Sequence, residues 1–74
     1  MNISVELFGQ LSPSSPRQQI LDLASTATVQ DAAELLGLNP EEIGMVTINS
    51  VQSELQDCLP PDCRLCFFPY LSGG

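Results

Sequence analysis

Apolar and polar side chains alternate at the start of the chain. Between residues 3 and 8 the apolar side chains recur at every second position, which is typical of a strand with one face against a core. Ile3, Val5 and Leu7 would face that core, and Phe8 falls on the opposite face. The pattern therefore predicts an N-terminal strand that is buried on one side only.

A loop and a second strand follow. Residues 9–17 contain glycine, serine and proline in a mixture that favours turns over regular structure. Residues 18–24 then predict a second strand, with Leu21 and Leu23 toward the core and Asp22 outward. We expect the two strands to form a hairpin.

A short helix is predicted after this hairpin. Thr28 can cap its first turn, and Asp31 places a negative charge near the positive end of the helix dipole, in the aspartate variant of a capping box. Gly37 would end the helix in a left-handed conformation, and Pro40 prevents it from continuing. The apolar side of the helix recurs at helical spacing and consists of Val29, Ala32, Ala33 and Leu36, with Leu35 widening it.

Two more strands complete the predicted fold. Residues 45–48 and 64–68 are short apolar runs bounded by turn-forming residues. The order of strand, strand, helix, strand and strand predicts one α+β domain over residues 1–74, with a mixed sheet packed on one helix. The inward side chains of the last two strands would be Val46, Ile48, Leu65 and Phe67.

One helix can cover only one face of such a sheet. Cys66 and Phe68 alternate with the inward residues of the last strand, so they would lie on the uncovered face. Together with Phe8 and Thr47 they would form an exposed apolar patch, and patches of this kind mark partner-binding sites more often than they are neutral. A covering loop or a dimer contact is the alternative.

Composition and charge narrow the classes of function. Nine acidic side chains face two basic ones, both arginine, for a net charge of −7, and histidine is absent. Nucleic acids and anionic membranes are bound through lysine and arginine, so we expect neither as a partner. The charge favours partners with basic surfaces, and the alternative is that it only maintains solubility. No apolar run approaches the roughly 20 residues of a membrane span, and no basic signal-peptide region is seen, which predicts a cytoplasmic location.

Three cysteines raise the possibility of a metal site. Cys58, Cys63 and Cys66 have the spacing of the first three ligands of a plant-type ferredoxin cluster. The sequence has no fourth cysteine and no histidine, so neither that cluster nor a structural zinc site has a full set of ligands. We therefore expect no bound metal, and keep a small iron–sulfur electron carrier as an alternative of another class.

The sequence stops at two glycines, with four residues between them and the last predicted strand. Pro69 stiffens the start of this tail, residues 69–74, and glycine allows close approach of the backbone to another surface at its end. Six extended residues at roughly 3.3 Å each reach about 20 Å. Gly73 and Gly74 could therefore enter a narrow channel in a partner while the domain stays outside. A frayed, dispensable end is the plain alternative.

The residues before the glycines resemble the end of a known family. The run Phe67-Phe68-Pro69-Tyr70-Leu71-Ser72-Gly73-Gly74 resembles the terminus of the MoaD/ThiS family of ubiquitin-like sulfur carriers, most of all the small subunits of molybdopterin synthase. The resemblance implies a ubiquitin-like β-grasp with the first and last strands side by side at the sheet centre.

The resemblance also implies roles for individual residues. The Gly74 carboxyl group would be adenylated and converted to a thiocarboxylate, and Gly73 would provide clearance. Phe68 would dock the domain on its activating enzyme, with Pro69, Tyr70, Leu71 and Ser72 lining the channel mouth. The chain departs from the family at Asp62, where a glycine is frequent, at Ser50 in an Asn-Gly turn, and at Tyr70 in place of a second proline.

On this resemblance the chain binds no cofactor and acts as a co-substrate rather than a catalyst. ATP would be used by a ubiquitin-activating-enzyme-like adenylyltransferase of the MoeB/ThiF type, and a persulfide would supply the sulfur. A MoaE-type large subunit of molybdopterin synthase would use it. Sulfur delivery to thiamine thiazole, cysteine or tungsten-cofactor synthesis stays open, as does a plain interaction module.

Overall fold

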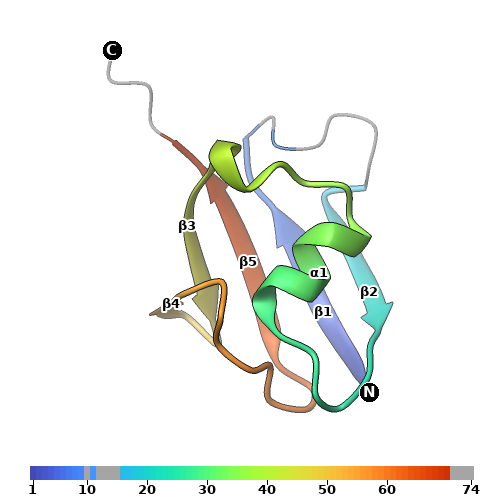
Figure 1. Ribbon diagram of the computed structural model, residues 1–74. Coiled ribbons are helices and arrows are strands. Elements are labelled where there is room, and N and C mark those ends of the chain that lie inside the picture. Colours follow the sequence, from blue (N-terminus) through green and yellow to red (C-terminus); the bar gives the residue numbers. More distant parts are fainter. Residues whose placement is uncertain (10, 12–15, 71–74) are drawn as a thin grey trace.

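The computed structural model describes residues 1–9, 11 and 16–70 and shows one helix packed across a five-stranded sheet (Figure 1). The predicted α+β class is confirmed. In chain order the elements are β1 (Asn2–Leu7), β2 (Gln18–Asp22), α1 (Val29–Leu35), the 3₁₀ turn η1 (Pro40–Glu42), β3 (Ile43–Ile48), β4 (Val51–Ser53) and β5 (Arg64–Pro69).

The last strand of the chain is the central strand of the sheet. The strand order is β2-β1-β5-β3-β4, with β1 and β5 parallel and all other neighbours antiparallel. Ser4 lies opposite Arg64, and Leu7 lies opposite Phe67. The expectation that the first and last strands lie side by side is confirmed. Strand β5 is therefore paired on both sides up to the start of the tail.

Strand β4 is the element that the sequence did not predict. Asn49 and Ser50 adopt positive φ angles of 51° and 70°, as a tight hairpin turn requires, and β4 pairs with β3 through only three residues. Its three residues, Val51, Gln52 and Ser53, show no alternation of apolar and polar side chains, and Val51 is 67% exposed. It is an edge strand held by backbone pairing rather than by burial.

The helix is capped as predicted. The Thr28 hydroxyl accepts a hydrogen bond from the Asp31 backbone N–H at 3.3 Å, and the Asp31 carboxylate accepts one from the Thr28 N–H at 2.9 Å. Gly37 follows with a φ of 73°. The prediction for Leu35 is wrong: this residue is 60% exposed, because at 3.6 residues per turn it lies about 100° around the helix from Leu36, outside the side that buries Val29, Ala32 and Ala33.

The core lies between α1 and the sheet. Strand β2 ends at Asp22, two residues earlier than expected, and Leu23 packs only partly buried against this core. The side chains that fill the core centre are less than 2% exposed and include Ile3, Val29, Cys63, Leu65 and Phe67.

Within the described residues, no helix is long and apolar enough to cross a membrane.

Candidate functional site

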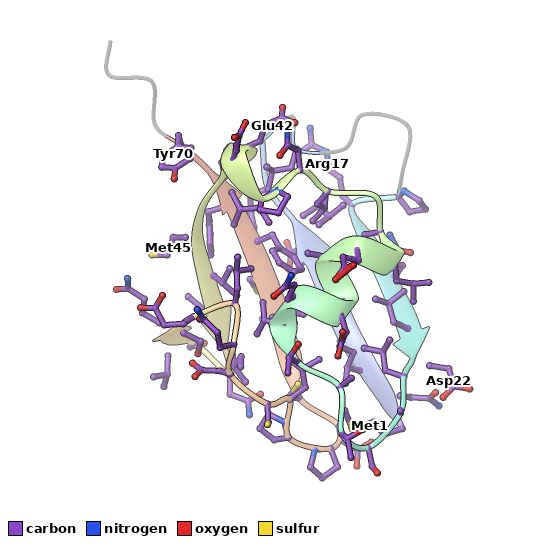
Figure 2. All side chains as sticks on the ribbon, in the orientation of Figure 1. Met1, Arg17, Asp22, Glu42, Met45 and Tyr70 are labelled. Atoms are coloured by element: carbon purple, nitrogen blue, oxygen red, sulfur yellow. The ribbon has the colours of Figure 1, made fainter. Side chains whose placement is uncertain are left out.

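Strand β5 ends where the tail begins. Pro69 is its last residue, paired with Ile43 of β3, and Tyr70 beyond it is 64% exposed. Figure 2 places Met1 and Tyr70 at opposite ends of the molecule. The predicted site residues Leu71, Ser72, Gly73 and Gly74 lie outside the described residues, so the structure defines the base of the tail.

Two glycines that the sequence analysis did not single out flank this base. A Cβ atom on Gly9 would lie 2.6 Å from the Pro69 Cγ atom, and one on Gly44 would lie 2.7 Å from the Pro69 carbonyl oxygen and 2.8 Å from the Tyr70 backbone nitrogen. Gly9 also has a φ of 67°, which favours glycine. The pairing between β3 and β5 shifts register between Ile43 and Met45, at Gly44 itself. Side chains larger than hydrogen at these positions would displace Pro69 and Tyr70.

Phe8 and Phe68 lie together on the face of the sheet away from α1. Their ring centroids are 4.5 Å apart and their planes differ by 10°, which is a stacked pair. Both side chains are half-buried. The predicted placement of these two residues on the uncovered face of the sheet is therefore observed. Their two rings stack on each other.

Cys66 is on the same face but is not part of the exposed surface, and that prediction is wrong. Its residue is only 7% exposed. It sits on the central strand with Glu6 directly opposite on β1 and Thr47 directly opposite on β3, so neighbours cover it from both sides. Arg64 forms an ion pair with Glu6 across this region, and that hydrogen bond raises the pKa of the Arg64 guanidinium.

An apolar groove adjoins the stacked phenylalanines. It has a volume of about 540 Å³ and contains no charged side chain among its described lining residues. Such a hollow can accept an apolar side chain of a partner. Met45, 38% exposed, is a lining residue that the sequence analysis had assigned only to a strand. The lining consists of Phe8, Gly9, Gly44, Met45, Phe68, Pro69 and Tyr70.

The three cysteines are not gathered at one place. Cys63 belongs to the core under α1, Cys66 lies on the other face of the sheet, and Cys58 is exposed. Over residues 1–9, 11 and 16–70, no group of three or more His, Cys, Asp or Glu side chains is arranged to hold a metal ion. The ferredoxin-like spacing is thus not accompanied by a cluster of ligands in this part of the chain.

The sheet order, the single crossing helix and the central C-terminal strand define the ubiquitin-like β-grasp fold. No protein-family model and no curated protein matches the chain. Solved structures do match. SAMP1 from Haloferax volcanii is similar, with a TM-score of 0.79 and 26% identity, over 100% of this chain and 100% of that chain. A crystal structure of H. volcanii small archaeal modifier protein 1 matches with a TM-score of 0.78 and 22% identity, over 95% and 98% of the two chains.

Sequence reasoning found the aromatic residues of the site but not the glycines. Phe8 could be assigned to the open face because it breaks the apolar alternation of the first strand. Phe68 could be assigned there because it follows the inward-facing Phe67. Gly9 and Gly44 contact Pro69 and Tyr70 from distant parts of the chain, and only the sheet topology brings them together. A glycine inside an otherwise apolar strand, as at Gly44, is the one available signal, because it indicates a bulge or a close backbone approach.

Proposed function

We propose that the chain is a sulfur carrier whose Gly74 carboxyl group is activated and loaded with sulfur. The observation that carries this proposal is the exit of the tail: the central strand delivers Pro69 and Tyr70 between two glycines to one end of the domain. An apolar groove lies beside that exit. We infer that a partner which receives the residues after Tyr70 would dock on this groove.

The chemistry falls on the terminal carboxylate. The carboxylate oxygen would attack the α-phosphorus of ATP, and pyrophosphate would leave. The terminal sulfur of a persulfide would then attack the carbonyl carbon, and AMP would leave. A thiol would cleave the sulfur–sulfur bond of the resulting acyl disulfide, releasing the thiocarboxylate and a disulfide. The side chains of this chain dock and orient, and take no part in proton transfer.

The finer form of the proposal makes the chain the small subunit of a molybdopterin synthase. The sequence from Phe67 to Gly74 supports it, because it resembles the end of those subunits. A MoaE-type large subunit would receive the tail and use its sulfur. The partners are an adenylyltransferase of the MoeB/ThiF type, which uses ATP, and a persulfide donor.

A second candidate function is protein modification. It is favoured by the structural similarity to the small archaeal modifier protein, which extends over the full chain. The same adenylate would then be attacked by a lysine amine of another protein, forming an isopeptide bond to Gly74. The chain contains two basic side chains, both arginine, so its own side chains offer no amine for this reaction.

Intact mass spectrometry tests both functions. The purified chain, verified to end at Gly74, is incubated with ATP, a persulfide donor and the ubiquitin-activating-enzyme-like adenylyltransferase of its own genome. A sulfur carrier gains the mass difference between one sulfur and one oxygen atom. When a lysine-containing acceptor protein replaces the persulfide donor, a modifier instead appears in covalent adducts that survive reducing conditions.

A matched variant guards against modification elsewhere in the chain. Gly73→Val adds a branched side chain next to the reacting group, and we expect it to abolish activation while the fold stays intact. Unchanged loading of this variant, or loading of a chain that lacks Gly73 and Gly74, would overturn the proposed function.

A further inference from the structure

Strand β2 forms one edge of the sheet (Figure 1). It pairs with β1 over five residues without a shift of register, and among the described residues no strand lies on its outer side. Natural edge strands are usually kept from pairing with other chains by shortness, a bulge, a lysine or a proline. The opposite edge, β4, is only three residues long. Strand β2, from Gln18 to Asp22, has none of these protecting features.

The backbone groups of alternate residues of β2 point away from β1. Just after the strand, the Leu23 N–H donates a hydrogen bond to the Met1 carbonyl oxygen at 2.8 Å, so the Leu23 backbone faces β1. The hydrogen-bonding direction alternates along an antiparallel strand, so the N–H and C=O groups of Gln18, Ile20 and Asp22 face outward. Each of these residues therefore offers one donor and one acceptor to a further strand.

An apolar side chain lies at the centre of the same edge. Ile20 is 71% exposed, which is the largest exposed fraction among the large apolar residues of the described part of the chain. Leu21 beside it is buried in the core, so Gln18, Ile20 and Asp22 lie together on the open face of the sheet. A strand added at the outward backbone groups would also cover Ile20, because residues directly opposite each other have Cβ atoms about 5 Å apart.

A second copy of this strand fits the edge in one antiparallel register. Centred on Ile20, the pairing sets the two isoleucines opposite each other and sets Gln18 opposite Asp22, whose carboxylate can accept a hydrogen bond from the amide. Centred on Asp22, it would set two carboxylates opposite each other, and like charges there are destabilising. Centred on Gln18, it would set Ile20 opposite Pro16, which has no N–H. Centres between these residues would set Ile20 opposite a polar side chain.

We propose that the outer edge of β2 is a self-association surface, at which a second copy of the chain pairs antiparallel about Ile20. The strand is its own complement, which favours a second copy over an unrelated peptide. The two sheets become one continuous sheet, with both α1 helices on the same side. Strand β1 separates the contact from β5, so the tail bases at Pro69 stay clear of it. Self-association at β2 does not depend on the proposed function.

The dimer is weak, and its strength depends on salt. One pair of five-residue strands buries less than the roughly 1,200 Å² of a stable complex. The net charge of −7 on each copy opposes association at low salt, and added salt screens this repulsion. We expect a monomer at low salt and a dissociation constant on the order of 0.1–1 mM at about 1 M sodium chloride.

The test introduces the same positive charge at three exposed positions. Ile20→Lys places two ammonium groups opposite each other at the centre of the pairing. Gln18→Lys places an ammonium group opposite Asp22 of the second copy. Val51→Lys is the matched control, because Val51 is 67% exposed on β4 at the other edge of the sheet.

Sedimentation equilibrium under reducing conditions measures the dissociation constant of the dimer for each full chain, at low and at high salt and up to about 1 mM protein. Circular dichroism establishes that each variant is folded. We expect Ile20→Lys to raise the dissociation constant at least about tenfold at high salt, although it lowers the net negative charge. Val51→Lys should stay within about threefold of the wild type. Gln18→Lys should lower the dissociation constant about two- to fivefold relative to Val51→Lys, since two ion pairs form in the dimer.

A wild-type chain that sediments as a monomer at about 1 mM and high salt overturns the proposal. Equal effects of Ile20→Lys and Val51→Lys also overturn it, because net charge or another surface then governs association. A dimer that Gln18→Lys does not strengthen relative to Val51→Lys contradicts the pairing centred on Ile20. None of these results bears on the loading of sulfur, so the proposed function is tested separately.

Discussion

The two faces of strand β5 differ in burial: one is packed into the core and the other borders an open groove. On the face under α1, Leu65 and Phe67 are 0% exposed and join side chains from the helix and from all of the longer strands. On the other face, Phe68 is half-buried against Phe8 and borders an open groove. The same strand thus supplies both fully buried core residues and a residue that borders the open groove.

The largest effect is expected when a side chain is removed from the core face of β5. Phe67→Ala removes a fully buried aromatic ring, and we expect a loss of about 3–5 kcal/mol in the free energy of unfolding. That is a large part of the total stability of a small domain. Urea denaturation followed by circular dichroism measures it. A loss below about 1 kcal/mol would show that the core is not organised around this residue.

The next largest effect is expected at the tail base. Gly44→Ala places a Cβ atom within 2.8 Å of the Tyr70 backbone, so β3 or the tail must move, at a cost of about 1–3 kcal/mol. Activation by the adenylyltransferase should fall as well, because the tail leaves the domain in a different direction. The check is KM for activation together with the free energy of unfolding.

Gly37→Ala is a matched control for this prediction. Its φ of 73° disfavours alanine, but nothing lies within 4 Å of the added Cβ atom. It should cost about 1 kcal/mol and leave activation unchanged. Similar losses of activation in the two variants would mean that stability, rather than tail direction, controls the reaction.

The open face should respond in the reverse way. Phe68→Ala removes the stacked ring, and we expect only about 1–2 kcal/mol of lost stability with a marked rise in KM for activation. Ile20→Ala is the control, because Ile20 is 71% exposed on β2, opposite Ser4 and outside the lining of the groove. An unchanged KM for Phe68→Ala would remove the docking role from this face.

The fold was predictable where a pattern repeats. The alternation in β1 and the cap formed by Thr28 and Asp31 follow from local sequence, and the structure confirms them. Strand β4 was not predictable, because its three residues carry no alternation. Leu35 was misassigned because the sheet covers a narrower side of the helix than the run of apolar residues suggested.

The site was predictable only in part. The alternation in β5 placed Phe68 on the open face, but it also placed Cys66 there as an exposed residue. Its burial comes from neighbours on two other strands, which no local pattern contains. The glycines around Pro69 depend on the same long-range pairing. Contacts between distant segments therefore decide both what the sequence missed and what it assigned wrongly.

The smallest predicted effect is a pH dependence of the free energy of unfolding that comes from Cys63 in the core. Burial raises the pKa of the Cys63 thiol, with the Asp62 carboxylate acting in the same direction, so the folded chain keeps a proton that the unfolded chain gives up at about pH 8.5. Between that value and the higher folded pKa, the free energy of unfolding must fall as the pH rises. Below it, this thiol contributes no slope.

Urea denaturation at neutral pH and at about pH 9.5 measures this slope, and Cys63→Ala should make it shallower. Cys58→Ala is the control, since Cys58 is exposed and outside the core. The chain contains no lysine, so few other groups titrate in this range. An identical slope in wild type and Cys63→Ala would mean that ionisation of this thiol is not opposed by the core. The core around Cys63 would then be more open to water than the 1% exposed fraction of this residue indicates.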